Sequence, residues 1–308
     1  MLDKSDIRFI LPHHGWLYKH IKDIGFEIYD PYTGNALFPR ILREIHFRLN
    51  LPIKSIWYNK VNHVNKKTIF IFESLIIPDY IKWLHNNTKN GRIILFYANP
   101  VRVSVDPNLI DDDWCEKWTA DILDSKEYNL KLYEGGGYFS KWKVEKETPS
   151  MDVFYVGKDK GRLEKTLTLK KQFDELGLNT YFHITAERGF KPKKDKNHKP
   201  FMPYEEILKI LGKTKAILHL IDGCQKGITM RIAESLIHEI KLVTDDKDIV
   251  NYDFYHPNNI FILEVDDISR LPAFLNSSYT HVKSTFYNHP YFEDMVNIIV
   301  GVDEGEYR

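Results

Sequence analysis

The sequence predicts an α/β protein made of two tandem units, each built on a parallel sheet. Short apolar runs of strand length alternate with helix-length amphipathic segments through both halves. The chain has 308 residues, which is enough for two hydrophobic cores. The alternation breaks between the glycine triple at 135–137 and the polar stretch 143–150. We therefore expect domains at 1–147 and 148–283, with 284–308 as a helix packing back on the first domain.

The individual elements follow from apolar periodicity and from the turn residues between them. Strands are expected at 7–11, 26–29, 55–58, 69–72, 92–97, 129–133, 152–156, 178–184, 216–221, 241–244 and 259–263. Helices are expected from Trp16 onward and at 38–49, 74–86, 113–122, 163–176, 203–212, 228–237, 267–275 and 284–300. The lysine-rich stretch 189–199 is expected to be a surface loop.

Composition excludes several functional classes. The 43 basic residues balance 43 acidic residues, so the whole chain carries no signal for nucleic acid. Cys115 and Cys224 lack the neighbours of a metal site or a redox pair, which favours a reducing cytoplasm. The charged N-terminus runs straight into a strand, so no signal peptide is expected. No apolar run approaches the roughly 20 residues of a membrane span. We expect a soluble or peripheral cytoplasmic protein.

The segment 217–246 has the features of an anion site. An apolar strand is followed by a glycine-bearing loop, a helix and a second strand. The loop carries Lys226 and opens the helix, whose first N–H groups have no partner within the helix, so a phosphate is held well there. Glu234 lies about two turns into the helix, where its carboxylate can accept hydrogen bonds from vicinal sugar hydroxyls. A nucleotide is the simplest ligand with both parts.

A second basic loop, 157–162, follows the first strand of the same unit. Together the two loops offer side-chain cations and backbone N–H groups that would surround a diphosphate without a metal ion. The candidate donor-binding residues are Lys158, Lys160, Arg162, Gln225, Lys226, Gly227, Thr229 and Glu234. Taken alone, the loop 157–162 is equally well read as a solvated turn.

These motifs resemble the GT-B glycosyltransferases, and more closely the small bacterial enzymes of capsular, exopolysaccharide or lipopolysaccharide assembly. The run Gly-Ile-Thr-Met-Arg-Ile-Ala-Glu-Ser-Leu-Ile-His-Glu-Ile-Lys-Leu-Val-Thr-Asp-Asp at 227–246 looks like the donor-binding segment of that family. The loop 157–162 is similar to its first phosphate loop, and 253–260 also looks like the small capsular enzymes. The resemblance spans about 152–263, and the first half is matched mainly by architecture.

The resemblance implies two Rossmann-like domains facing across a cleft and a nucleotide-diphosphate sugar as donor, without a metal or other cofactor. Glu234 would contact the ribose, and Lys158, Lys160 and Arg162 would hold the diphosphate. Glu239-Ile240 replace a glycine that is frequent in the family. The acidic residue common in retaining members is missing, so the stereochemical outcome stays open.

Candidates for the catalytic base lie in the first unit. His14, in the turn after the first strand, occupies the place where several inverting GT-B enzymes keep a histidine, and an imidazole can accept a hydroxyl proton near neutral pH. Glu73 ends the strand 69–72, and Asp30 is a weaker candidate. A structural histidine and a helix N-terminal charge are the alternative roles of His14 and Glu73. The consecutive carboxylates 111–113 cannot all face one ion, so we expect no metal site there.

The stretch 40–67 is rich in basic residues interleaved with aromatic ones. It holds Arg40, Arg43, Arg48, Lys54, Lys60, Lys66 and Lys67 against the single acid Glu44, together with Phe47, Trp57 and Tyr58. Phe38 lies just before it. This pattern is typical of a membrane-surface or lipid-phosphate patch. A solvated helix face is an equally good interpretation.

The sequence therefore predicts a metal-independent hexosyltransferase that acts on a lipid-linked saccharide in bacterial surface polysaccharide synthesis, with no nucleic-acid partner. Two alternatives stay open. One is a non-catalytic sugar-nucleotide-binding subunit of a polysaccharide assembly complex, and the other is a sugar-nucleotide epimerase. A dinucleotide-dependent dehydrogenase is disfavoured, because no Gly-x-Gly-x-x-Gly motif follows the first strand.

Overall fold

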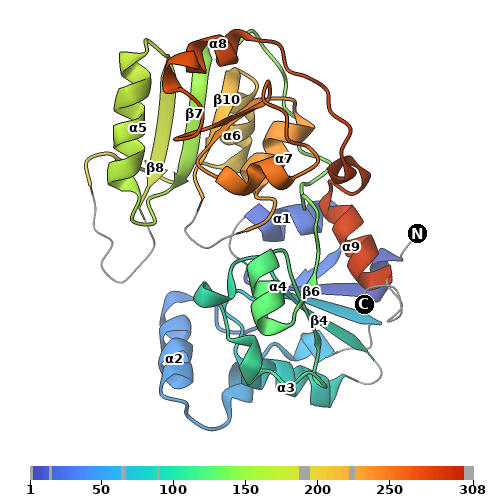
Figure 1. Ribbon diagram of the computed structural model, residues 1–308. Helices are drawn as coiled ribbons and strands as arrows, with labels where there is room; N and C mark the ends of the chain where they lie inside the picture. Colours follow the sequence, from blue (N-terminus) through green and yellow to red (C-terminus); the bar gives the residue numbers. More distant parts are fainter. Residues whose placement is uncertain are drawn as a thin grey trace. The chain divides into compact units, whose positions relative to one another are not determined.

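A computed structural model describes residues 3–13, 16–63, 67–88, 91–186, 195–221 and 226–301. The chain divides into two compact units, drawn in Figure 1. Unit 1 comprises Met1–Glu134 with Val296–Arg308, and unit 2 comprises Gly135–Met295. We describe each unit by itself.

Unit 1 contains a six-stranded, fully parallel sheet in the order β2-β1-β3-β4-β5-β6. The strands are β1 (Ile7–Ile10), β2 (Glu27–Tyr29), β3 (Thr68–Phe72), β4 (Arg92–Tyr97), β5 (Glu116–Thr119) and β6 (Lys131–Leu132). Every residue of β1 and β3 is buried, as expected for strands covered on both faces. The order in which the strands are added reverses between the neighbours β1 and β3.

Helices cover both faces of this sheet, with α1 on one side and α3 on the other (Figure 1). The helices of unit 1 are α1 (Trp16–Asp23), α2 (Leu37–Arg48), α3 (Pro78–Asn87) and α4 (Ile122–Tyr128). Tyr80, Ile81 and Leu84 of α3 pack on alternate strand residues in one core cluster. The opposite alternation places Phe9 and Phe70 in an aromatic layer with ring centroids 5.1 Å apart.

Two expected elements of unit 1 are wrong. Residues 55–58 are not a strand, because Lys54–Trp57 form a 3-10 helix. Residues 113–122 are not a helix, because β5 occupies Glu116–Thr119 and α4 begins only after Asp121, whose carboxylate caps it. Glu116 forms ion pairs with Arg92 and Lys131. These ion-pair partners on the neighbouring strands favour a strand at 116–119. The periodicity of the local sequence does not contain them.

Unit 2 contains a second six-stranded parallel sheet, in the order β12-β11-β10-β7-β8-β9. Its strands are β7 (Met151–Lys158), β8 (Thr180–Thr185), β9 (His198–Lys199), β10 (Thr214–His219), β11 (Lys241–Thr244) and β12 (Ile260–Ile262). Renumbered within the unit, this is the 3-2-1-4-5-6 order of the doubly wound nucleotide-binding sheet. The direction of winding reverses between β7 and β10.

The helices of unit 2 pack on both faces of its sheet. They are α5 (Leu163–Glu175), α6 (Tyr204–Leu211), α7 (Met230–Ile237) and α8 (Leu271–Asn276). Leu169 of α5 and Leu271 of α8 share one core cluster with alternate strand residues such as Val153. The other strand residues, such as Ile217, point to the opposite face, where α6 and α7 contact β10.

The last helix, α9 (Phe292–Gly301), begins in unit 2 and ends in unit 1. In unit 2, the Phe292 N–H donates to the carbonyl of Tyr138 at 2.7 Å. In unit 1, the Arg92 guanidinium donates to the carbonyl of Val300 at 2.8 Å. Among the described residues, no helix is both long and apolar enough to cross a membrane.

Candidate functional site

The two basic loops predicted from the sequence follow the two strands at the reversal point of the unit 2 sheet. β7 ends at Lys158, and β10 ends at His219. β7 and β10 are adjacent and parallel, with Phe154 beside Ile217, so their carboxyl ends meet at the same edge. Ligands of such sheets bind beyond this edge, at the point where the winding reverses. The topology thus brings the loop 157–162 and the segment after β10 to one place.

The first loop is a tight turn fixed from both sides. The Arg162 N–H donates to the carbonyl of Asp159 at 2.8 Å, while Lys160 and Gly161 adopt φ of +48° and +74°. Glycine takes such a conformation without strain. The Asp159 carboxylate accepts from the Leu163 N–H at 2.9 Å and from His198 Nε2 at 3.0 Å. Lys158 and Lys160 have exposed side chains at this edge.

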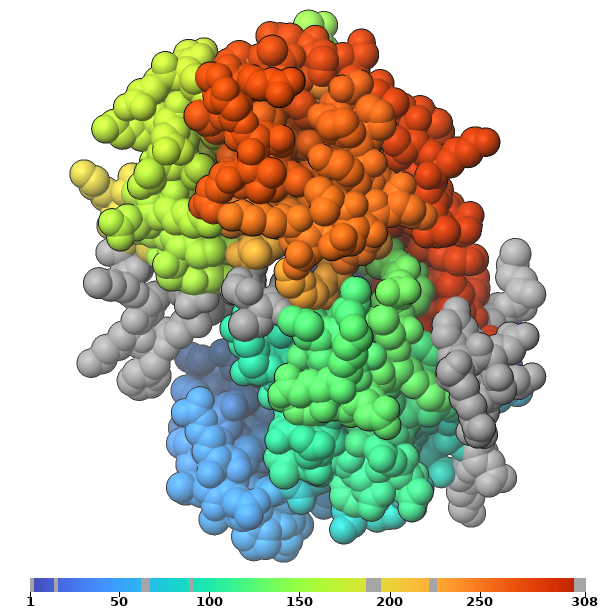
Figure 2. Space-filling view, viewed as in Figure 1, coloured from blue at the N-terminus to red at the C-terminus, as the bar shows by residue number. Residues whose placement is uncertain are grey.

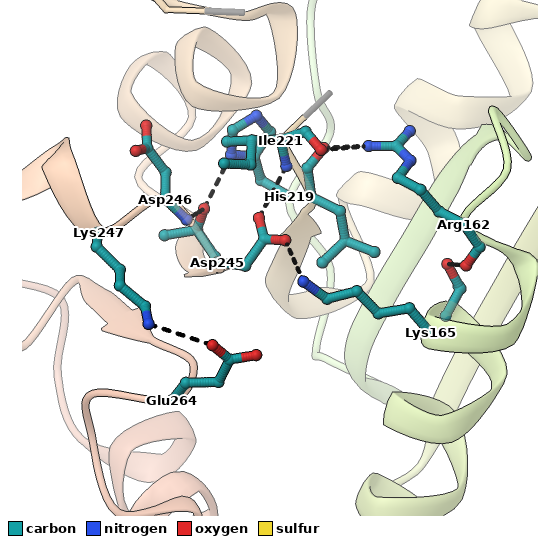
Figure 3. A network of polar contacts seen from close by, with 11 residues as sticks. Arg162, Lys165, His219, Ile221, Asp245, Asp246, Lys247 and Glu264 are labelled. Carbon is teal, nitrogen blue, oxygen red and sulfur yellow. Dashed lines mark hydrogen bonds and ion pairs between the residues drawn. The ribbon is translucent and has the colours of Figure 1, made fainter. Parts of the chain in front are cut away.

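Arg162 joins the first loop to the residues directly after β10. Its Nη1 donates to the carbonyls of Leu220 at 2.6 Å and Ile221 at 2.9 Å. Figure 3 shows the Arg162 guanidinium beside Ile221. Its Nη2 also approaches the Lys158 carbonyl at 3.5 Å. Arg162 Nε is buried and has no hydrogen-bond partner among the described residues. The structure therefore places one guanidinium between the first loop and the residues after β10, with one N–H donor unused among the described residues.

A polar network beneath this arginine was not predicted from the sequence. The Asp245 carboxylate accepts from the Ile221 N–H at 2.8 Å and pairs with Lys165 at 2.9 Å (Figure 3). Beside it, His219 Nδ1 lies 2.9 Å from Thr244 Oγ1. One sequence signal could have found Asp245, because the polar pair 245–246 comes directly after a buried strand, at the same carboxyl edge.

A groove of about 800 Å³ lies beside this network. Gly161 and Lys165 line one side, and the segment 263–268 after β12 lines the other. That segment contributes Glu264, Asp266 and Asp267, of which Glu264 pairs with Lys247 at 3.2 Å. Carboxylates repel phosphate, so the basic loop edge suits a diphosphate better than this groove does.

The cation predicted in the second loop is engaged by carboxylates. Lys226 forms ion pairs with Asp248 and, at 3.8 Å, with Asp246. The hydrogen bond to Asp248 raises the pKa of Lys226. Gly227 adopts φ of +137°, and the Thr229 hydroxyl caps α7 by accepting from the Ile232 N–H at 3.4 Å. A diphosphate would have to displace the acids to reach this ammonium.

Glu234 is fully buried in α7. One carboxylate oxygen accepts from the Tyr204 hydroxyl at 2.5 Å, and the other pairs with the Arg231 guanidinium. Burial raises the pKa of Glu234. Each oxygen keeps a second lone pair, so a ribose hydroxyl can still donate to it if Arg231 moves aside. Tyr204 and Arg231 were not predicted as partners of Glu234. Tyr204 lies outside the segment 227–246, and Arg231 lies within it but was given no role.

Of the two base candidates, Glu73 is described, and it follows β3 directly, beside the point where the strand order of the unit 1 sheet reverses. Glu73 is buried and accepts from the backbone N–H groups of Ala98 and Asn99 at 3.1 and 3.2 Å, and from the Asn99 amide at 2.7 Å. Burial raises the pKa of Glu73. These bonds tie the ends of β3 and β4 together. Its part in catalysis stays a prediction.

The remaining predicted residues fall in three groups. His14 and Gln225 lie outside the described residues. Asp30 accepts from the His13 N–H at 2.6 Å and so holds the turn after β1. The acidic residues 111–113 form a turn in which Asp111 accepts from the Asp113 N–H at 3.0 Å. Within the described ranges, no cluster of three His, Cys, Asp or Glu side chains could hold a metal.

The buried His219 makes stability depend on pH. Burial lowers its pKa to about 4, whereas an unfolded histidine has a pKa of about 6.5. Below pH 6.5, His219 is protonated in the unfolded chain but stays neutral in the folded chain. The free energy of unfolding therefore falls as pH decreases toward 4. From pH 7.5 to 5, we expect His219→Gln to lose about 2 kcal/mol less unfolding free energy than the unmodified chain. Urea unfolding at both pH values measures this.

The matched control is His281→Gln, because the His281 side chain is 75% exposed. This variant should keep the full pH dependence. If the unfolding free energies of His219→Gln and of the unmodified chain depended equally on pH, the lowered pKa of His219 would be contradicted.

No protein-family model and no curated protein matches the sequence. Among solved structures, the chain is similar to the lipopolysaccharide outer core galactosyltransferase WaaB in its apo form, with 11% identity over 96% of this chain and 99% of that chain and a TM-score of 0.50. It also matches the spinosyn forosaminyltransferase SpnP, with 11% identity over 96% of this chain and 98% of that chain and a TM-score of 0.44. The chain has a glycosyltransferase fold of the GT-B type, as the sequence predicts.

Proposed function

We propose that this protein is a glycosyltransferase that moves a hexose from a nucleotide-diphosphate sugar to a hydroxyl of a lipid-linked saccharide in bacterial surface polysaccharide synthesis. The observation that carries the proposal is Arg162. It bonds to the segment after β10 at the point where a doubly wound sheet receives its ligand. The GT-B fold supports transfer chemistry, and the galactosyltransferase among the similar structures makes hexose donors the first to test.

In the proposed reaction, the bond between the sugar's anomeric carbon and the diphosphate oxygen breaks, and the acceptor oxygen bonds to that carbon. Negative charge grows on the leaving diphosphate. Lys158, Lys160 and Arg162, together with the first N–H groups of α7 behind Thr229, would stabilise this charge. These groups provide positive charge at the same edge of one sheet, which is why we propose that no metal is needed.

The acceptor hydroxyl loses its proton to a base of unit 1, for which His14 and Glu73 are the candidates. Both follow strands at the reversal point of the unit 1 sheet, where ligands of such sheets bind. The bonds that Glu73 already accepts, together with its buried position, favour His14. An imidazole can accept a proton near neutral pH, which suits a general base.

Calorimetry of nucleoside diphosphate binding in the presence of a chelator tests the donor half of this proposal. We expect binding without divalent metal, and at least about tenfold weaker binding by Arg162→Gln, because charged hydrogen bonds contribute about 1.5–3 kcal/mol each. Arg270→Gln is the matched control, since Arg270 is an exposed arginine of unit 2 outside both loops. Absence of binding, or binding only with metal, would contradict the proposal.

Transfer is measured on the same preparation with nucleotide hexoses and membrane extracts as acceptor. Incorporation of the sugar supports the transferase. Binding without transfer or hydrolysis indicates the sugar-nucleotide-binding subunit instead. Interconversion of the free donor without an acceptor indicates an epimerase.

A further inference from the structure

Helix α2 has its burial inverted. The one residue of this helix that is buried is Arg43, at 4% exposure. Its large apolar side chains face outward instead, with exposures from 42% to 72%: Leu37, Phe38, Ile41, Leu42 and Ile45. At 100° per residue, these five positions fall within one arc of about 140°, while Arg43 lies on the opposite side. A core-packed helix would show the reverse arrangement.

The inward side of α2 is fixed to unit 1 by specific contacts. The Arg43 guanidinium donates to the Thr33 carbonyl at 2.8 Å and lies 5.0 Å from the centre of the Tyr32 ring. The half-buried Phe47 ring packs edge-on against Tyr32 at 5.2 Å. These contacts hold the orientation of the helix, so rotation about its axis cannot bury the apolar arc.

The exposed apolar surface continues beyond the helix. It includes Leu49, Leu51, Ile53, Ile56 and Val61, each at least 42% exposed. Ten of the eighteen exposed large apolar side chains in the described part of the chain therefore fall within residues 37–61, which we call the α2 surface. Figure 2 shows this segment in light blue at the surface of unit 1. Such a concentration marks an interaction site, since scattered single apolar residues are the norm.

The charges around the α2 surface are mainly positive. Arg40, Arg48 and Lys60 are exposed, and Glu44 is the single carboxylate in 37–61. On the helix circumference, Arg40 lies about 60° outside the apolar arc, and Arg48 lies just inside the same edge of the arc. An apolar arc with cationic flanks fits the interface of an anionic bilayer, where the hydrocarbon takes the apolar groups and the headgroups take the charges.

The structure also corrects the sequence interpretation of 40–67. Tyr58 is buried, and Trp57 and Phe47 are half-buried, so these aromatics belong to the body of unit 1. Lys54 pairs with Asp79 at 2.7 Å, and Lys67 pairs with Asp6 at 2.7 Å. Lys66 lies outside the described residues. The surface is instead made by aliphatic residues and Phe38.

We propose that the α2 surface lies in the headgroup region of an anionic membrane, with its apolar arc turned toward the acyl chains. This inference deepens the proposed function, because it names the surface by which the enzyme would meet a lipid-linked acceptor. Binding to vesicles needs neither donor nor acceptor. Its failure and the failure of sugar transfer are therefore separate results.

Flotation with vesicles tests the inference. We expect the full chain to bind vesicles of 70% phosphatidylcholine and 30% phosphatidylglycerol much more than vesicles of phosphatidylcholine alone, and to lose binding in high salt. Phe38→Ser combined with Ile41→Ser should weaken binding about tenfold or more, since each side chain loses part of its transfer free energy. Arg40→Gln combined with Arg48→Gln should weaken binding to anionic vesicles only.

The matched control is Phe201→Ser combined with Leu109→Ser, because Phe201 is 70% exposed, as Phe38 is, and Leu109 is 63% exposed. This variant should bind vesicles normally. Equal weakening by both double variants would overturn the inference, and so would normal binding by Phe38→Ser combined with Ile41→Ser. Light scattering tests whether the α2 surface binds a second copy of the chain instead. A dimer that dissociates when Phe38 and Ile41 are replaced would overturn the membrane inference and assign the surface to that second copy.

Discussion

Replacing Glu234 by alanine is expected to lower the free energy of unfolding by about 3–5 kcal/mol. The Glu234 carboxylate is fully buried, and its two oxygens bind the Tyr204 hydroxyl and the Arg231 guanidinium. Alanine leaves a cation and a hydroxyl without their partner in the interior of unit 2. Urea denaturation measures the loss. Glu264→Ala is the matched control, because Glu264 forms an exposed ion pair with Lys247 and should change stability by less than about 1 kcal/mol.

Glu234→Gln separates the structural role of this residue from contact with a ribose. The amide can still accept from Tyr204, so most of the stability should remain. If the carboxylate also accepts from ribose hydroxyls, the variant should bind a nucleoside diphosphate about tenfold more weakly and bind inorganic pyrophosphate normally, since charged hydrogen bonds contribute about 1.5–3 kcal/mol. Equal weakening for both ligands would show that Glu234 acts only by holding α7 in place.

Much of this fold could be predicted, because parallel strands that are buried on both faces have continuous apolar runs in the sequence. β11 is found from such a run, and α7 is found from its apolar residues at helical spacing. The failures are also physical. The strand at Glu116–Thr119 depends on ion pairs with Arg92 and Lys131 of the neighbouring strands, and no local pattern contains those partners.

The proposed donor site shows the same division. Glycines and lysines after strands identify the loop at Lys158 and the loop at Lys226. The order of the strands in the sheet decides which charged side chains of these loops contact which partners. Sheet order places Arg162 against the carbonyls after β10, and it brings Asp246 and Asp248 to Lys226. A lysine in a basic loop of the sequence can therefore be paired with carboxylates in the structure.

The inverted helix α2 is a different kind of case. Its periodicity alone predicts an amphipathic helix with its apolar side against the core, and the helix is found at its expected position. The structure turns that side outward because Arg43 has partners inside unit 1, in the Thr33 carbonyl and the Tyr32 ring. Periodicity identifies the apolar face of a helix, but only the neighbouring elements decide what covers it.

The identity of the catalytic base leads to the second prediction with a large effect. His14→Ala is expected to lower the turnover number by about 10²–10⁴-fold, the usual contribution of a positioned general base. Donor affinity should not change, because the proposed donor residues lie in unit 2. The rate of the unmodified enzyme should rise with pH as the imidazole loses its proton, and this limb of the pH profile should disappear in the variant.

Glu73→Gln is the decisive comparison for this assignment. The Glu73 carboxylate accepts from Ala98, from the Asn99 backbone and from the Asn99 amide, so an amide in its place turns one of its own donors toward these donors. We expect a loss of about 1–3 kcal/mol in unfolding free energy, with turnover retained by the molecules that stay folded. The opposite pattern, in which Glu73→Gln folds normally and stops transfer while His14→Ala remains active, would move the base from the turn after β1 to the end of β3. Because burial raises the pKa of Glu73, a carboxylate base there would lose its proton only above the usual pH range of glutamate, and the rising limb of the pH profile would then survive in His14→Ala.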